Sequence, residues 1–318
     1  MDNARFTEMV TFYENQQNKK GEKVKINHLL VYQKGDYQTH AFNNKDLNDI
    51  RSISKTVMTL LFGRICMLYN ENGKTLSEET FVYPIIKEAI NLTNEENLEQ
   101  LKKIQVKHLL THTIGYEDVL LMRGDIKDKD PYSYVDYLVN HPIVHHPGEY
   151  YLYSNAGFYL LSVFLQELLG RDLLEVADEV LFSKLEIKEY RWEKYGNYLA
   201  GATRLWLYPE DLLKMGQLLL NKGSYRGEQL ITEEWIDKMI TITNHTPDVD
   251  NSNFKFRRFG YGYGIWLAKD SFYFGHGTDG QILAILPDEE LIVVTLSNEP
   301  DLLSIEEGVE KIIRRARE

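Results

Sequence analysis

The most informative residues of this chain are a serine and a lysine three positions apart, Ser52 and Lys55. They open an apolar run with helical spacing, so we expect them to share one face of the first turn of a helix. The lysine amine can accept the proton of the serine hydroxyl, and the free backbone N–H groups and positive dipole end of the helix favour the developing alkoxide. A hydroxyl activated in this way is a nucleophile for acyl transfer.

The Ser-x-x-Lys spacing is common, and the chain contains it again at Ser252 and Lys255. That second copy lies in a polar stretch without an apolar period, so we interpret it as a chance match. Behind the first copy, apolar residues recur at helical steps and predict a buried stripe that fixes the helix: Met58, Leu61, Phe62, Ile65 and Leu68. For the spacing alone, the commoner explanation is a capped core helix with an exposed lysine.

A second candidate motif is the Tyr-x-Asn formed by Tyr153 and Asn155, in a tight loop just before an apolar helix. The phenol could relay a proton, and the carboxamide could hold a carbonyl group or the lysine amine. The same motif occurs at Tyr13-Glu14-Asn15 and Tyr195-Gly196-Asn197, so it is weak by itself. The alternative is that Ser154 or Asn155 only caps the next helix.

The third motif is the glycine-rich stretch from Phe274 to Gln281, between two expected strands. Small residues let the carbonyl group of a substrate approach the strand edge closely. A backbone N–H there can be the second donor of an oxyanion hole, beside the N–H of Ser52. A plain hairpin turn also explains the glycines, but it explains His276 less readily.

The order of these three motifs resembles the serine β-lactamase and penicillin-binding-protein superfamily. The resemblance is closest to the class C β-lactamase-like branch, which includes esterases, D-amino-acid amidases, DD-peptidases and 6-aminohexanoate-oligomer hydrolases. It covers nearly the whole chain, because further segments are similar to that branch: Val106 to Gly115, Leu181 to Ile187, Ala200 to Ala202, Tyr208 to Leu212, Gly216 to Leu218 and Leu296 to Asn298.

The resemblance implies roles for individual residues. Ser52 would be the nucleophile, Lys55 its proton acceptor and Tyr153 the partner base and acid. Asn155 would contact the substrate amide, and His276 would replace the lysine of the family's Lys-Thr-Gly strand. A buried lysine near a tyrosine can be neutral at neutral pH, which agrees with these roles. No metal or cofactor is implied.

The chain departs from the family pattern at His276-Gly277-Thr278, where relatives commonly have Lys-Thr-Gly or His-Thr-Gly. Either Thr278 or Asp279 could therefore supply the second oxyanion-hole N–H. We expect Asn155, His276, Gly277, Thr278 and Asp279 to bind the substrate. The stretch after Thr278 is also shorter than in true class C β-lactamases and more like that of the 6-aminohexanoate hydrolases.

The other reactive side chains do not indicate a further catalytic or metal site. His108 and His112 are one helical turn apart, but no glutamate follows the first as hydrolytic zinc sites require, so we do not expect a metal. Cys66 is the only cysteine, which excludes an intrachain disulfide, and it falls in the apolar helix after Ser52 as a buried thiol.

Composition restricts the class of protein. The 318 residues are 43% hydrophobic, enough for one large domain or two intimate ones. A net charge of −12 and a pI near 5.3 argue against a nucleic-acid partner. Met1 to Lys23 contains no apolar stretch long enough for a signal peptide or membrane span, so we predict a cytoplasmic protein without a membrane partner.

The pattern of elements predicts an α+β fold. Val24 to Phe42 reads as a hairpin, several short strands follow between Tyr263 and Leu296, and Ile305 to Ala316 has helical spacing. The long middle of the chain is helical. We therefore expect an antiparallel sheet domain made by residues 1–75 and 205–318, flanked by terminal helices, with an all-helical insertion over 76–204 and the active site at their interface.

Together these observations predict a serine hydrolase that acts through an acyl-enzyme on a small ester, amide or peptide, with β-lactams as a further substrate class. The alternative is a catalytically weak penicillin-binding, peptide-binding or sensor protein with the same fold.

Overall fold

The computed structural model describes residues 1–43, 45–245, 258–268 and 272–318. The second Ser-x-x-Lys and the turn expected at Lys269 and Asp270 lie outside this part of the chain. The chain divides into two compact units, Met1–Ile53 with Leu205–Glu318 and Ser54–Arg204. The first division falls after Ile53 rather than after residue 75, so the helix that follows Ser52 belongs to the second unit.

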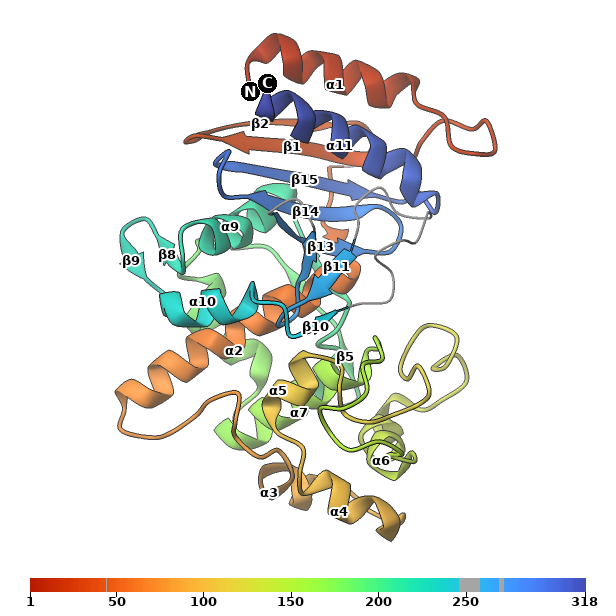
Figure 1. The fold of residues 1–318 in the computed structure, drawn as a ribbon, viewed down its shortest axis with the longest axis vertical. Helices are drawn as coiled ribbons and strands as arrows, with labels where there is room; N and C mark the ends of the chain where they lie inside the picture. The colour runs from red at the N-terminus through yellow and green to blue at the C-terminus, as the bar shows by residue number, and fades with distance from the viewer. Residues whose placement is uncertain (44, 246–257, 269–271) are drawn as a thin grey trace. The chain divides into compact units, whose positions relative to one another are not determined.

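Within the described residues of the first unit, eight antiparallel strands form one sheet in the order β10-β11-β12-β13-β14-β15-β1-β2 (Figure 1). The apolar runs of β14 and β15 are buried at every position, as expected for strands covered on both faces. The strand bounds are β1 Ile26–Gln33, β2 Asp36–Ala41, β10 Asn244–His245, β11 Arg258–Tyr261, β12 Trp266–Ala268, β13 Tyr273–Gly277, β14 Gln281–Leu286 and β15 Leu291–Ser297.

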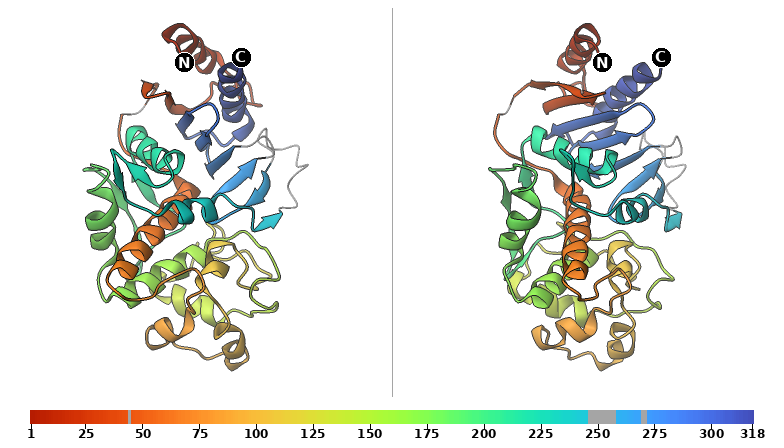
Figure 2. Two further views of the ribbon diagram at one scale, coloured as in Figure 1. Left: turned by 60° about the vertical axis from the view of Figure 1, so that its left-hand side comes forward. Right: turned by 90° about the vertical axis from the view of Figure 1, so that its left-hand side faces the viewer.

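Helices cover both faces of this sheet (Figures 1 and 2). The terminal helices α1 (Asn3–Asn15) and α11 (Leu302–Arg317) pack together over β1, β2 and β15. Helix α9 (Pro209–Leu220) packs on β14, β15 and β1, and α10 (Glu233–Met239) follows it. A mixed fold with an antiparallel sheet and terminal helices is the fold class that the sequence predicted.

The sequence predicted terminal helices but did not place α1 at particular residues, because this segment is polar and has no clear apolar stripe. Tertiary contacts hold it instead: Tyr13 is 2% exposed and its hydroxyl donates to the carbonyl of Ile305, 2.8 Å away. Gly308 leaves the room for this ring, since a Cβ there would lie 2.3 Å from it. At the other end of α1, Asp2 accepts a hydrogen bond from the backbone N–H of Arg5.

The second unit is mainly helical, and its longest helix is α2 (Ser54–Glu71). Every residue of α2 from Ser54 to Cys66 is buried, so this is a core helix of the unit. The apolar pattern over 98–110 predicts one helix, but the structure contains two, because Gln105 is extended and caps a new helix. The other helices are α3 Tyr83–Ile86, α4 Leu98–Leu101, α5 Val106–Leu110, α6 Tyr134–Asn140, α7 Ala156–Leu169, α8 Leu173–Ala177 and the π-helix η5 Asp178–Phe182.

Short elements complete the two units. The 3-10 turns are η1 Arg51–Ile53 in the first unit and η2 Lys87–Ala89, η3 Glu95–Asn97 and η4 Pro131–Ser133 in the second. In the first unit β3 (Asn48–Asp49) pairs with β7 (Leu205–Leu207), and β8 (Ser224–Tyr225) pairs with β9 (Glu228–Gln229). The second unit contains β4 Arg191–Trp192, β5 Lys194–Tyr195 and β6 Tyr198–Leu199. None of the described helices is both long and apolar enough to cross a membrane.

Candidate active site

Ser52 lies in the 3-10 turn η1, one turn earlier than the sequence suggested, and α2 begins directly after it at Ser54. The strand pair β3–β7 fixes the chain just before this turn, since the N–H of Ile50 also donates to the carbonyl of Leu205. Ser52 is half-buried. Ser52 is therefore held on a short, constrained turn near the end of the segment Met1–Ile53 of the first unit.

Arg51, next to Ser52, has a left-handed backbone with φ of 52°. This conformation costs a residue with a side chain free energy, because its Cβ crowds the following carbonyl oxygen. The guanidinium bonds to Asp49 at 2.8 Å and to Asp279 at 3.0 Å. The backbone N–H of Arg51 also donates to Asp49 at 2.9 Å. Two carboxylates thus hold the turn in its strained form.

The end of β13 packs against the same turn. A Cβ on Gly277 would lie 2.8 Å from the Cβ of Arg51 and 2.8 Å from the carbonyl oxygen of Ile50. Only a glycine fits without a shift of backbone, so this residue sets how closely the strand and the turn approach. Thr278, Asp279 and Gly280 follow as the turn into β14, and Gln281 braces them by donating to the carbonyls of Thr278 and Asp279.

The side chain of His276 points to the face of the sheet that α11 covers, because neighbouring residues of a strand point alternately to the two faces. It is 7% exposed, and its Nε2 lies 3.1 Å from a carboxylate oxygen of Glu306 on α11. Its Nδ1 lies 3.1 Å from the guanidinium of Arg258. Burial lowers the pKa of His276, and the hydrogen bond to Glu306 opposes that shift. This side chain therefore makes structural contacts, unlike those expected of a substrate-binding replacement for lysine.

In the second unit, Lys55 is fully buried and its amine is enclosed by polar partners. Its Nζ donates to Oδ1 of Asn155 at 2.8 Å and to the carbonyl of Ala202 at 3.2 Å. It also lies 4.7 Å from the ring centroid of Tyr153. Burial lowers the pKa of Lys55 from its ordinary 10.5, while the charge and hydrogen bonding of Tyr153 oppose the shift. The lysine of the motif is thus a desolvated amine, not an exposed one.

Asn155 is held as firmly as the lysine it accepts from. Its Nδ2 donates to the carbonyl of Leu121 at 2.8 Å, and its backbone N–H donates to the carbonyl of Leu120 at 3.1 Å. Because the amide nitrogen is used there, Oδ1 faces Lys55. Asn155 is also the residue before α7, yet its side chain makes no capping bond to that helix, so capping alone does not account for it.

Two residues of this cluster were not assigned a role from the sequence. Ala202 reaches Lys55 because Gly201 lets the chain pass close to α7: a Cβ on Gly201 would lie 2.3 Å from the carbonyl oxygen of Phe158. The ring of His112 lies 4.5 Å from that of Tyr153, centroid to centroid. Burial and the nearby Lys55 charge hold the pKa of His112 well below its ordinary value. An uncharged ring therefore packs beside the tyrosine.

His108, the other member of the suggested zinc pair, serves its own helix. Its Nδ1 accepts a hydrogen bond from the backbone N–H of Gln105 at 3.1 Å, while the Gln105 side chain bonds back to the helix. This reciprocal cap fixes the start of α5.

The predicted residues therefore form two groups. Lys55, Tyr153 and Asn155 lie together in the second unit. The turn that carries Ser52, with Gly277 and Asp279, lies together in the first. Ser52 and Lys55 are only three residues apart in the chain, on either side of the division after Ile53.

This fold and these motifs define a class of protein. The sequence matches the beta-lactamase family over residues 28–316, and the chain belongs to that family. The resemblance drawn from its motifs is thereby confirmed. A search of curated proteins found no match.

Solved structures with the same fold carry related descriptions. A candidate beta-lactamase from Bacteroides dorei DSM 17855 has a TM-score of 0.76 and 12% identity, with 100% of this chain and 99% of that one covered. The penicillin binding protein from Bacillus halodurans has a TM-score of 0.72 and 19% identity, covering 96% and 99%. A candidate 6-aminohexanoate-dimer hydrolase from Bacillus anthracis has a TM-score of 0.71 and 19% identity, covering 92% and 79%.

Proposed function

We propose that this protein is a serine hydrolase that works through an acyl-enzyme formed on Ser52. The observation that carries the proposal is the environment of Lys55, three residues after the serine. A buried amine with a lowered pKa, bonded to Asn155 and beside Tyr153, is suited to accept a proton rather than to hold a charge. Membership of the beta-lactamase family supports the same chemistry.

In the proposed reaction, the Oγ of Ser52 attacks the carbonyl carbon of the substrate while its proton passes to Lys55 or Tyr153. The carbonyl oxygen becomes an oxyanion, which the backbone N–H of Ser52 and that of Thr278 or Asp279 would stabilise. The tetrahedral intermediate expels the alcohol or amine, which takes the proton. Water then attacks the ester on Ser52 and gives a proton to the same pair. The second tetrahedral intermediate releases the acid, and the Ser52 oxygen takes that proton back.

This mechanism requires the hydroxyl of Ser52, the amine of Lys55 and the phenol of Tyr153 to lie within proton-transfer reach of one another. Asn155, Gly277, Thr278 and Asp279 would then line the substrate site. For His276 we propose a supporting role only: its side chain is engaged with Glu306, so any contact with substrate would come from its backbone.

For the substrate, we propose a small ester, amide or peptide, with β-lactams as a further class. The net charge of −12 disfavours polyanionic polymers as substrates. Descriptions of structurally similar proteins as beta-lactamase, penicillin binding protein and 6-aminohexanoate-dimer hydrolase span the same range of acyl compounds. The cytoplasmic location stays a prediction.

The second candidate function is a binding or sensor protein on this fold. The hydrogen bond of His276 to Glu306 on α11 favours it, because this side chain is then engaged within the sheet domain instead of taking the place of the family's strand lysine. The two functions differ in turnover.

A substrate panel separates them. We expect the wild-type chain to hydrolyse at least one of p-nitrophenyl esters, D-aminoacyl amides and nitrocefin, and Ser52→Ala to lose that activity by a factor of about a thousand or more. Ser54→Ala, a neighbouring serine that is fully buried, is the matched control and should keep it. Acylation of Ser52 at one equivalent without turnover would favour the binding protein. Equal activity of wild type and Ser52→Ala would show that Ser52 is not the acylated residue and would contradict both functions.

A further inference from the structure

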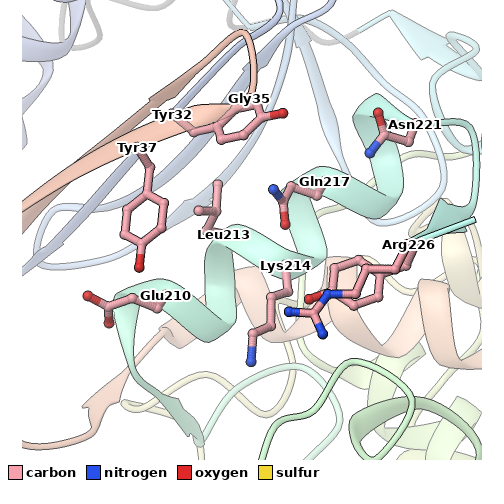
Figure 3. A pocket seen from close by; sticks show the side chains of 10 residues that line it. Tyr32, Gly35, Tyr37, Glu210, Leu213, Lys214, Gln217, Asn221 and Arg226 are labelled. Carbon is pink, nitrogen blue, oxygen red and sulfur yellow. The ribbon is translucent and has the colours of Figure 1, made fainter.

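The first unit contains a pocket that none of the predicted site residues lines. It has a volume of about 320 Å³, which is within the range of small-molecule sites. Its walls come from the β1–β2 hairpin, the outward stripe of α9 and the β8–β9 hairpin (Figure 3): Tyr32, Gly35 and Tyr37, then Glu210, Leu213, Lys214, Gln217 and Asn221, then Tyr225 and Arg226.

Both hairpins that wall the pocket are rigid. Lys34-Gly35 joins β1 to β2, and Arg226-Gly227 joins β8 to β9, each as a two-residue turn with positive φ at both positions. Such turns match the twist of the paired strands and hold their tips in one place. The pocket walls are therefore formed in advance of any ligand.

The acidic and the basic side chains of the pocket lie at different places on its walls. Figure 3 shows Glu210 at one end, with the Tyr37 hydroxyl pointing toward it, and Lys214 and Arg226 at the other. Lys214 is paired with Asp211 at 2.8 Å, so this lysine is neutralised within its own helix. Arg226 stands on the β8–β9 turn, with its guanidinium 5.5 Å from the ring centroid of Tyr225.

Glu210 has no ion-pair partner among the described residues, although it lines a pocket and follows the start of α9. The charge of Glu210 acts on His28, whose pKa is lowered by burial against the opposing effect of Glu210. A carboxylate beside a tyrosine hydroxyl offers oxygen acceptors to an ammonium group.

We propose that this pocket binds a small zwitterion, an amino acid or dipeptide with a free ammonium and a free carboxylate. The ammonium group pairs with Glu210 beside Tyr37, and the carboxylate pairs with Arg226. Leu213 and Tyr32 contact the apolar part between them, and Gln217 offers hydrogen bonds to a peptide group. Glu210 lies in the first turn of α9 and Arg226 on the β8–β9 turn, so the two charged groups come from different walls of the pocket.

The test is calorimetric titration of the Ser52→Ala chain, in which turnover cannot contribute, with L-leucyl-glycine at low ionic strength. N-acetyl-leucyl-glycine lacks the ammonium group and leucyl-glycinamide lacks the carboxylate, so each should bind at least about tenfold more weakly. Glu210→Gln and Arg226→Ala should each weaken leucyl-glycine binding by a similar factor.

Glu233→Gln is the matched control. Glu233 is an exposed acid in the first turn of α10, as Glu210 is in the first turn of α9, so it reproduces the loss of a charge at a helix start without touching the pocket. It should leave binding unchanged. Binding that survives Glu210→Gln would place the dipeptide elsewhere, including the proposed acyl site, and would overturn the proposal. So would the absence of heat with all three compounds at millimolar concentration.

Discussion

Arg51 has a backbone conformation that favours glycine, although it carries a long side chain. It adopts a left-handed backbone beside the proposed nucleophile, and two acidic side chains hold it there. A glycine would adopt this conformation without strain. The guanidinium that joins Asp49 to Asp279 connects the serine turn to the turn after β13, so we infer that Arg51 positions Ser52 relative to the proposed oxyanion donors.

Replacing Arg51 separates backbone strain from ion pairing. Arg51→Gly removes the ion pairs and the strain, whereas Arg51→Ala removes the ion pairs and keeps the strain. We expect the alanine variant to be less stable than the glycine variant by about 1 kcal/mol in urea unfolding. Both should acylate at least roughly tenfold more slowly, because the nucleophile is less well placed.

The exposed Arg314, which pairs with Glu310 in α11, provides the control: Arg314→Ala should change neither quantity appreciably. Full acylation rates in both Arg51 variants would show that the ion pairs serve stability alone.

The pH dependence reports on Lys55. In the proposed mechanism the neutral amine is the active form, so kcat/KM should rise with pH through the lowered pKa of Lys55 and reach a plateau below pH 10.5. Stability should follow the same direction: between the lowered folded pKa and 10.5 the unfolded chain binds more protons at this residue, so the free energy of unfolding rises with pH. A rate that still climbs near pH 10.5, measured with a pH-stable ester, would contradict a depressed lysine pKa.

At the scale of elements, Gly277 fixes the approach of β13 to the serine turn. Gly277→Ala would place a methyl group 2.8 Å from the backbone oxygen of Ile50, so strand or turn must move. We expect a loss of about 1–3 kcal/mol of unfolding free energy and a clear fall in kcat.

Gly124→Ala is the comparison, because a Cβ there meets nothing within 4 Å and its φ is not in the left-handed region. Thermal and urea unfolding of the two variants measure the difference. Equal stability would mean that the turn and strand do not pack as closely as described.

The sequence predicted well those elements whose structure is determined by their own apolar pattern and not by contacts with distant segments. The apolar runs of β14 and β15 and the apolar face behind Ser52 required burial, so they predicted strands and a core helix correctly. Helix α1 could not be predicted in this way, because Tyr13 and the contact with α11 hold it. The split between α4 and α5 depends on the backbone of Gln105, which no apolar period reveals.

For the candidate site, the motif residues were visible in the sequence but their surroundings were not. The spacing of Ser52 and Lys55 did not show that the amine would be buried against Ala202 and Asn155, since these come from segments far along the chain. The sequence also could not show which face of β13 His276 would occupy. A shift of one residue in the register of β13 would move the His276 side chain to the other face of the sheet, away from its contact with Glu306.

The charge of the whole molecule should influence which substrates react fastest. With a net charge of −12, the chain repels anionic substrates and the repulsion is screened by salt. We expect kcat/KM for an anionic ester to increase several-fold between about 20 and 300 mM NaCl, where the Debye length falls from roughly 20 to 6 Å. A neutral ester of the same acyl group should change little, and equal salt dependence of the two esters would contradict this expectation.

The central claim is the proposal that Ser52, Lys55 and Tyr153 act as one catalytic group. Reaction with a fluorophosphonate, followed by trypsin and mass spectrometry, tests it most directly. Cleavage after Arg51 and Lys55 releases the peptide Ser52-Ile53-Ser54-Lys55. The account predicts one adduct on this peptide at Ser52, absent in Ser52→Ala and formed far more slowly when Tyr153 is replaced by Phe. No adduct on the wild-type chain, or an adduct that persists in Ser52→Ala, would contradict it.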